Sequence, residues 1–383
     1  MKTMSRANSS EPNWQGRRVL IAAGGTGGHI FPALAVAQAL VAFGAELHWV
    51  GSNRGFEARV VRDAHKIDLT ELRFQGLRGR GLSALLSLPI RLFDALLQCR
   101  CLVRDFRPSL VLVFGGYVSF PVGIAAWMQR VLLIVHEQNA VMGTANRWLA
   151  RLATRVLTSF SPTRFSPASA ICVGNPVRPE LVTKPTASPR SLGQTQPLRL
   201  LVIGGSLGAR ALNQALPRAV AASRTSWPYG ITVRHQTGLS GHAEVKVRYQ
   251  DLGLGSDHVQ VDAFIDDMAE AYAWADLVVA RAGASTVSEL AALGLPALFV
   301  PLPNAIDDHQ AANAQAMVTA KAAVLVKQTP ELALDLGRCL TQLNFDRLRV
   351  MTDRAQSLAQ GPSSLENYLQ VLASLDYLNR VGP

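Results

Sequence analysis

A histidine at the end of a glycine-rich turn is the first group in this chain with a residue type and setting suited to chemistry. Four glycines surround Thr26 within residues 24–28, and the turn leads directly into His29. An unperturbed imidazole titrates near pH 6.5, so at neutral pH its ring can accept a proton from a hydroxyl group. Glycines let the backbone turn sharply and let a ligand approach it closely. The pattern favours a binding loop with a base beside it over a plain turn, which needs only one or two glycines.

Two common glycine-rich motifs do not fit. A dinucleotide fingerprint that starts at Gly25 requires glycine at position 30, which is Ile30. A P-loop requires lysine directly after a glycine, and no lysine in the chain follows one.

The elements on either side of the turn explain what it would bind. An apolar strand is expected over 19–23 and a helix over 31–43. Amides at the start of a helix point toward a ligand, and the helix dipole favours an anion there. The net charge of +11 also suggests an anionic partner. We expect no nucleic acid, because no zinc-finger spacing, RNA-recognition signature or lysine-rich tail is present.

Short apolar strands alternate with helices through the first half, which predicts an α/β fold with a parallel sheet. The expected strands are 19–23, 46–50, 110–114, 132–136, 155–158 and 170–173, and the expected helices are 31–43, 56–64, 90–104 and 118–129. Binding residues of such sheets follow the carboxyl ends of the strands. The loops that start at Gly115, His136 and Gly174 occupy such positions.

The opening pattern returns in the second half. Gly204 stands 180 residues after Gly24, and both follow a strand and precede a second glycine, a hydroxyl residue and a helix. This predicts two similar α/β domains that face each other across a ligand cleft. The predicted parts are a disordered extension (1–16), a first domain (17–180), a linker (181–197), a second domain (198–362) and a C-terminal helix (about 363–383) that packs back on the first domain.

The second domain has further candidate strands and polar turns. The strands are expected at 200–203, 231–235, 259–263, 277–280 and 297–300. Ser285 is the expected N-cap of a helix. We interpret Asp266-Asp267 and Asp307-Asp308 as turn and cap residues and expect no metal, and the four cysteines form no CxxC pair and have no histidines at metal-ligand spacing.

A basic segment, Arg73–Pro108, contains seven arginines, no lysine and two acidic residues, with apolar residues between them. Its longest charge-free run is too short to span a bilayer. Such a stretch can lie on an anionic membrane surface, and the alternative is an ordinary amphipathic helix packed on the sheet. We expect membrane contact, above all through the loop 74–88.

Taken together, the motifs resemble one family, the murein G transferases, which are the bacterial N-acetylglucosaminyl transferases of peptidoglycan synthesis. The matching stretches are GGTGGHIFPALAVA, GLRGRG, GGYVSFPVG, HEQNAVMGTANRWLA, GNPVR, GGSLGARALN, FIDDMAEAYAWADLVVARAGASTVSELAALGLPALFVPLP and DDHQAANA. They extend in the family's order from about Arg18 to Leu358. Two places depart from the pattern, namely Leu207, where glutamine often stands, and the loop Asn304–Asp308, which makes the register at His309-Gln310 variable.

This resemblance implies a GT-B architecture of two Rossmann-like, doubly wound parallel-sheet domains facing a central cleft. It implies an inverting hexosyltransferase, without a cofactor, that moves N-acetylglucosamine from UDP-N-acetylglucosamine to the C4 hydroxyl of a lipid-linked muramyl-pentapeptide diphosphate (lipid I), giving lipid II. The implied location is the cytoplasmic side of the cell inner membrane, as a peripheral protein. The implied donor-binding residues are Thr26, Gly27, Gly28, Asn139, Arg178, Ser206, Ile265, Ala284, Ser285, Thr286, Val287, Ser288, Glu289 and Gln310.

Residue chemistry suggests roles within that set. Arg178 and the helix starts near Ser206 and Ser285 suit the leaving diphosphate. The two oxygens of Glu289 suit a pair of ribose hydroxyls, although a carboxylate is also favoured near any helix N-terminus. Asn139 and Gln310 are amides suited to sugar hydroxyls, and the backbone of Ile265 suits uracil. His29 is the first candidate for the base and Glu137 the second.

Proteins with two other functions would have a similar two-domain architecture. An isomerase such as a UDP-N-acetylglucosamine epimerase would bind the same donor without an acceptor or a membrane surface. A catalytically silent nucleotide-sugar-binding protein would bind the donor without transfer. The basic segment Arg73–Pro108 favours the transferase.

Overall fold

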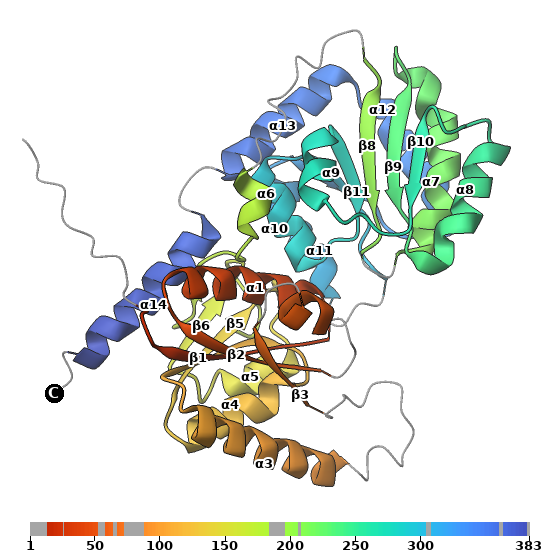
Figure 1. The fold of residues 1–383 in the computed structure, drawn as a ribbon. Helices are drawn as coiled ribbons and strands as arrows, with labels where there is room; N and C mark the ends of the chain where they lie inside the picture. The colour runs from red at the N-terminus through yellow and green to blue at the C-terminus, as the bar shows by residue number, and fades with distance from the viewer. Residues whose placement is uncertain are drawn as a thin grey trace, which may run out of the picture.

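The structure is a computed structural model that describes residues 14–25, 27–52, 58–63, 67–72, 88–183, 196–205, 208–303, 308–359 and 363–380. It contains two parallel sheets, each in its own domain (Figure 1). Within the described residues, the first sheet has seven strands in the order β3-β2-β1-β4-β5-β6-β7. Its strands are β1 (Arg18–Ala23), β2 (Glu46–Ser52), β3 (Asp68–Leu72), β4 (Leu110–Gly115), β5 (Leu132–Glu137), β6 (Arg155–Thr158) and β7 (Ile171–Cys172).

Helices cover both faces of this sheet. They are α1 (Gly27–Ala42), the π-helix η1 (Ala58–Asp63), α3 (Leu88–Phe106), α4 (Ser119–Met128) and α5 (Thr144–Leu149). The short helix α6 (Pro179–Thr183) instead packs on the second domain, and its Leu181 belongs to a core cluster of that domain. Two apolar clusters, one on each face, bury every residue of β4. A strand that is covered on both faces has no polar side, which is why its sequence is apolar throughout.

The second sheet repeats the plan. Six described strands are ordered β10-β9-β8-β11-β12-β13. They are β8 (Leu198–Ile203), β9 (Ile231–Gln236), β10 (Val259–Asp262), β11 (Leu277–Ala280), β12 (Ala297–Phe299) and β13 (Ala323–Leu325). The helices are α7 (Arg210–Ser223), η2 (Arg224–Ser226), η3 (Leu239–Gly241), α8 (His242–Asp251), α9 (Met268–Trp274), α10 (Ala284–Leu293), α11 (His309–Thr319), α12 (Leu332–Gln342) and α13 (Phe345–Ala359).

Both sheets reverse their strand order beside the first strand, between β1 and β4 and between β8 and β11. Helices on the two sides of such a point leave the sheet in opposite directions, so a crevice opens at the carboxyl ends of the strands. The predicted glycine turns, at Gly24-Gly25 and Gly204-Gly205, follow β1 and β8. The topology therefore puts both turns where a ligand crevice forms.

The last helix, α14 (Ser364–Arg380), returns to the first domain and lies beside α1 (Figure 1). Tyr368, Leu372 and Leu375 are buried in the core cluster of the first sheet. The hydroxyl of Ser364 donates a hydrogen bond of 2.6 Å to the carbonyl of Asn175. The chain thus crosses between the domains twice.

The sequence missed two edge strands and misjudged one helix. The strand β3 is half exposed and lacks the apolar run that predicts a buried strand. The strand β13 has three residues within the short apolar run 322–326, and periodicity alone does not distinguish such a run from part of a buried helix. The predicted helix 56–64 is a π-helix in its described part, Ala58–Asp63. Among the described residues, no helix combines the length and apolarity needed to cross a bilayer.

Candidate active site between the two domains

His29 and the glycine turn before it pack against two adjacent glycines. Gly115 and Gly116 end β4 with φ of +105° and +82°, values that side chains rarely allow. A Cβ atom on Gly115 would lie 2.7 Å from Cδ2 of His29, and one on Gly116 would lie 2.2 Å from the carbonyl oxygen of Gly24. The sequence marked this glycine pair only as a loop after a strand. The structure makes it the surface against which the first glycine turn and His29 pack.

The surroundings of His29 lower its pKa below 6.5. The main cause is burial, which disfavours the charged ring, and the neighbouring His309 of the second domain acts in the same direction. The negative charge of Glu137 and a hydrogen bond with the backbone of Gly24 oppose this effect. The imidazole is therefore neutral at pH 7, which is the form that accepts a proton.

The carboxylate of Glu137 is fully used within its own loop. Its Oε1 accepts hydrogen bonds from the backbone N and Nδ2 of Asn139, at 3.0 and 3.1 Å. Its Oε2 accepts from the backbone N of Gly143 and Nδ2 of Asn146, at 2.9 and 2.8 Å. Four donors match the four acceptor sites of a carboxylate. This arrangement fits a residue that shapes the loop 137–146 better than one that removes a proton.

The guanidinium of Arg178 lies between the domains. It stacks over the ring of Phe31 on α1, 4.5 Å from the ring centroid. Its Nη2 lies 3.8 Å from Oε1 of Glu289 on α10, and its Nη1 lies 3.9 Å from Glu180. A Cβ atom on Gly27 would lie 2.8 Å from the ring of Phe31, so a glycine at 27 leaves room for that ring. Nothing in the sequence marked Phe31 as a site residue.

Glu289 is buried on α10 as the sixth of its ten residues, beyond the first turn where a helix N-terminus favours a carboxylate. The hydroxyl of Tyr272, from α9, donates a 2.8 Å hydrogen bond to its Oε2. Burial raises the pKa of Glu289, while Arg178 and the Tyr272 hydrogen bond favour the ionised form and limit the rise. Tyr272 had no signal in the sequence, because one aromatic residue in an apolar helix face is ordinarily a core residue.

Arg178, Glu289 and Tyr272 line a cavity of about 290 Å³ between the domains, and the two base candidates, His29 and Glu137, are not among its lining residues. The predicted residues that line it are Gly27, Gly28, Arg178, Ile265, Ala284, Ser285, Thr286 and Glu289. The amide side chain of Gln236, which the sequence analysis missed, also lines it and links two of its walls. It accepts from the backbone N of Ile265 and donates to the carbonyl of Gly205, both at 3.0 Å. Ile265 itself is buried, and its backbone N–H is already paired with Gln236.

We expected Ser285 to be the N-cap of α10, and the structure shows that it is not. Gly283 occupies the cap position, and the helix begins at Ala284. The hydroxyl of Ser285 donates instead to the carbonyl of Gly28 in the first domain, at 3.3 Å. The side chain is used across the cleft because α10 points its N-terminus at the first glycine turn.

Asn313 of α11 is a second link between the domains. Its Oδ1 accepts from the backbone N of Ala140 at 2.8 Å, and its Nδ2 donates to Oδ1 of Asn139 and to the carbonyl of Ala282, both at 3.2 Å. The residue is fully buried. It therefore connects the loop that Glu137 shapes with the loop before α10.

The remaining predicted residues lie elsewhere. Gln310 accepts a hydrogen bond from the backbone N of Leu302, and neither it, Asn139 nor Ser288 lines the cavity. Val287 is buried in the core of the second domain. Asp267 caps α9, as expected, by accepting from the backbone N of Glu270. Thr26, Ser206 and residues 304–307 lie outside the described residues.

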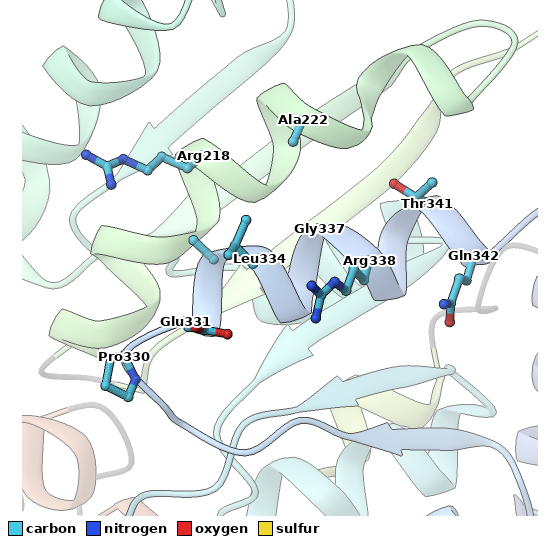
Figure 2. A pocket seen from close by; sticks show the side chains of 10 residues that line it. Arg218, Ala222, Pro330, Glu331, Leu334, Gly337, Arg338, Thr341 and Gln342 are labelled. Carbon is cyan, nitrogen blue, oxygen red and sulfur yellow. The ribbon is translucent and has the colours of Figure 1, made fainter.

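No group of three or more histidine, cysteine, aspartate or glutamate residues suited to a metal ion occurs in the described part of the chain. A larger hollow of about 600 Å³ lies between α7 and α12 (Figure 2). It is bordered by Arg218, Ala222, Leu334 and Arg338, among others, and by none of the predicted binding residues. The cavity between the domains remains the candidate active site.

Comparison with protein families agrees with this geometry. The glycosyltransferase family 28 N-terminal domain matches residues 19–158, and the glycosyltransferase family 28 C-terminal domain matches residues 199–368. The chain belongs to glycosyltransferase family 28. The two matches correspond to the two sheets, and the architecture is that of a GT-B enzyme.

Named relatives within family 28 match almost the whole chain. A protein of Marinobacter nauticus is 46% identical over 90% of this chain and 94% of its own. One of Aeromonas hydrophila is 47% identical over 90% of this chain and 95% of its own. Both are named UDP-N-acetylglucosamine–N-acetylmuramyl-(pentapeptide) pyrophosphoryl-undecaprenol N-acetylglucosamine transferase.

Solved structures share the fold. The crystal structure of Acinetobacter baumannii MurG has a TM-score of 0.74 and 35% identity, with coverage of 94% of this chain and 99% of that one. A putative UDP-N-acetylglucosamine 2-epimerase of Listeria monocytogenes has a TM-score of 0.65 at 15% identity, with coverage of 96% and 98%. At that identity the second likeness concerns the fold alone.

The link through Asn313 is open to a direct test. Asn313→Ala removes the partners of a buried N–H and a buried carbonyl, each of which costs about 1–3 kcal/mol when left unpaired. We expect a lower melting temperature and, by small-angle X-ray scattering, a larger radius of gyration as the domains separate. Gln315→Ala, at an exposed position of the same helix, is the matched control. Equal effects of the two substitutions would show that Asn313 does not hold the domains together.

Proposed function

We propose that this protein transfers N-acetylglucosamine from UDP-N-acetylglucosamine to the C4 hydroxyl of a lipid-linked muramyl-pentapeptide diphosphate (lipid I), which gives lipid II for peptidoglycan synthesis. The observation that supports it most is the interdomain cavity, where Arg178 faces Glu289 and glycine turns of both domains meet. A cation, helix-start amides and a buried carboxylate together suit a nucleoside diphosphate. The names of relatives that match about nine-tenths of the chain agree with it.

In this proposal the second domain (198–362) binds the donor, and the first domain (17–180) holds the acceptor and the membrane, with 181–197 as the linker. The backbone of Ile265 faces the uracil, and Glu289 accepts hydrogen bonds from two ribose hydroxyls. Arg178 and the amides at the start of α10 face the diphosphate. Asn139 and Gln310 remain proposed ligands of the sugar, reached if the loop of Asn139 and the start of α11 move on binding.

The chemistry then needs one proton transfer and one displacement. The neutral ring of His29 accepts the proton of the acceptor hydroxyl as its oxygen attacks C1 of the sugar from the face opposite UDP. The bond between C1 and the diphosphate oxygen breaks, and UDP leaves with the electron pair. Negative charge that develops on the diphosphate is stabilised by Arg178 and the α10 amides. We propose His29 and not Glu137 as the base, because four hydrogen bonds occupy the carboxylate of Glu137.

An epimerase is the second candidate, since the fold also occurs in a putative UDP-N-acetylglucosamine 2-epimerase. It is less supported, because that likeness is limited to 15% sequence identity. An epimerase would release UDP, or invert the configuration at one carbon of the sugar, without an acceptor.

A membrane surface is proposed on α3, which buries small side chains and exposes large ones. Ala95, Cys99 and Val103 face the core, while Ile90 and Phe93 are 68% and 60% exposed. The end of α4 adds exposed Trp127 and Met128, and Gln129 there donates a hydrogen bond to the carbonyl of Arg100 on α3. Figure 1 shows α3 on the side of the first domain away from the second.

Exposed arginines at 91, 100, 104 and 107 accompany these apolar side chains. Apolar residues flanked by cationic ones are typical of peripheral binding to anionic lipid. The rest of the predicted segment, residues 73–87, lies outside the described residues. A peripheral position on the cytoplasmic side of the inner membrane is the corresponding proposal for localisation.

The function is tested by UDP release from UDP-N-acetylglucosamine with and without lipid I. We expect release that depends on the acceptor, because the attacking oxygen belongs to it. Release without acceptor would favour the epimerase, and no release in either case would favour a silent binding protein.

His29→Ala should lower kcat about 100-fold or more, the usual effect of removing a general base, and leave the Kd for UDP unchanged. Because burial lowers the pKa of His29 below 6.5, the neutral base is lost only in more acidic solution. The wild-type kcat/KM should therefore stay constant down to about pH 6.5 and fall below it. His48→Ala, near the amino end of β2, is the control. An unchanged turnover in His29→Ala would exclude the base role.

The proposed membrane surface is tested by Ile90→Ser with Phe93→Ser, measured by sedimentation with phosphatidylglycerol vesicles. Each lost side chain should reduce partitioning about tenfold, the equivalent of roughly 1.5 kcal/mol of apolar burial. Leu334→Ser is the matched control, since Leu334 is 58% exposed on the second domain. Partitioning equal to that of the control would refute this surface.

A further inference from the structure

The carboxylate of Glu289 is held from two sides in the cavity wall. Tyr272 donates to Oε2 at 2.8 Å, and Arg178 lies 3.8 Å from Oε1. Tyr272 is 2% exposed and Glu289 is 8% exposed, and both line the cavity. Because the phenol bonds one oxygen at close range, it fixes the rotation of the carboxylate and leaves the remaining acceptor sites for a ligand.

We propose that Tyr272 is a positioning residue for recognition of the donor ribose, acting through Glu289. This inference rests on the proposed function. A carboxylate accepts hydrogen bonds from two adjacent hydroxyls at once only in one orientation. The hydroxyl of Tyr272, on α9, sets that orientation for Glu289, on α10. Tyr272 touches Glu289, and nothing in the proposal requires it to touch the sugar.

The hydrogen bond also controls the charge of Glu289. Burial favours the protonated acid, and the nearby Glu180 acts in the same direction, so the pKa of Glu289 is raised. Arg178 and Tyr272 oppose this by favouring the carboxylate. A protonated Glu289 would lose acceptor capacity toward two hydroxyls. Loss of the phenol should therefore weaken ribose binding both by freeing the rotation and by moving protonation of Glu289 to higher pH.

Tyr272→Phe tests the proposal because it keeps the ring and removes only the hydroxyl. By titration calorimetry we expect UDP to bind roughly tenfold more weakly, the scale of a lost hydrogen bond to a charged group. The pH below which UDP affinity falls should move upward. The preference for UDP over 2′-deoxy-UDP should decrease, because Glu289 no longer accepts a well-oriented hydrogen bond from the ribose 2′-hydroxyl. At saturating donor, kcat should stay within about twofold of wild type while the donor KM rises.

Tyr249→Phe is the matched control in the same domain. Tyr249 is buried like Tyr272, but its hydroxyl lies 3.1 Å from Nδ1 of His235 and it does not line the cavity. In a Glu289→Gln background, Tyr272→Phe should have no further effect on UDP affinity. Equal UDP affinity and equal pH dependence in Tyr272→Phe and Tyr249→Phe would overturn the proposal.

The outcome is separable from that of the proposed function. Wild-type protein that binds UDP but transfers no sugar to lipid I would refute the transferase, and the comparison of the two tyrosine variants would still stand. Transfer that is normal in wild type, with unaltered ribose discrimination in Tyr272→Phe, would refute only the role of Tyr272.

Discussion

The arrangement of the two domains depends on the contacts that the partly buried guanidinium of Arg178 makes with both of them. Its side chain is 17% exposed, so its charge needs partners within the protein. Its partners are the face of Phe31 in the first domain, the carboxylate of Glu289 in the second, and Glu180 two residues along the chain. A cation between two domains draws both toward it, and an anionic ligand can take the place of part of this pairing. In the proposed function, the diphosphate would meet a cation that contacts both domains.

The doubly wound topology explains why glycines line the cavity beside that cation. Each sheet opens a crevice where its strand order reverses, and both crevices are at carboxyl ends of strands. Glycines at these ends leave the backbone uncovered, so Gly116 can pack on the carbonyl of Gly24 and Gly27 can admit the ring of Phe31. The same lack of side chains lets the N-terminus of α10 reach Gly28 through Ser285. Four glycines, at 27, 28, 205 and 283, thus line the cavity beside larger side chains such as those of Phe31 and Gln236.

Two acidic residues near the cleft have different roles because their surroundings differ. Glu137 is saturated by four donors from its own loop and acts on His29 only through its charge. Glu289 has one close donor and one distant cation, so it keeps acceptor sites for a ligand. The division follows from the number of hydrogen-bond donors around each carboxylate and not from residue type.

The sequence by itself determined the two α/β domains and the glycine turns, and its resemblance to a known family indicated eight of the seventeen residues that line the cavity, among them Arg178 and Glu289. The domains and turns follow from local rules, because apolar runs, glycine spacing and helix starts each concern a few neighbouring residues. The edge strands β3 and β13, whose pairing depends on distant strands, were not predicted. Only the tertiary structure decided that Ser285 bonds across the cleft, that Tyr272 holds Glu289, and that Gly115 packs against His29. Those contacts join residues that are far apart in the chain or on different helices, so no local pattern specifies them.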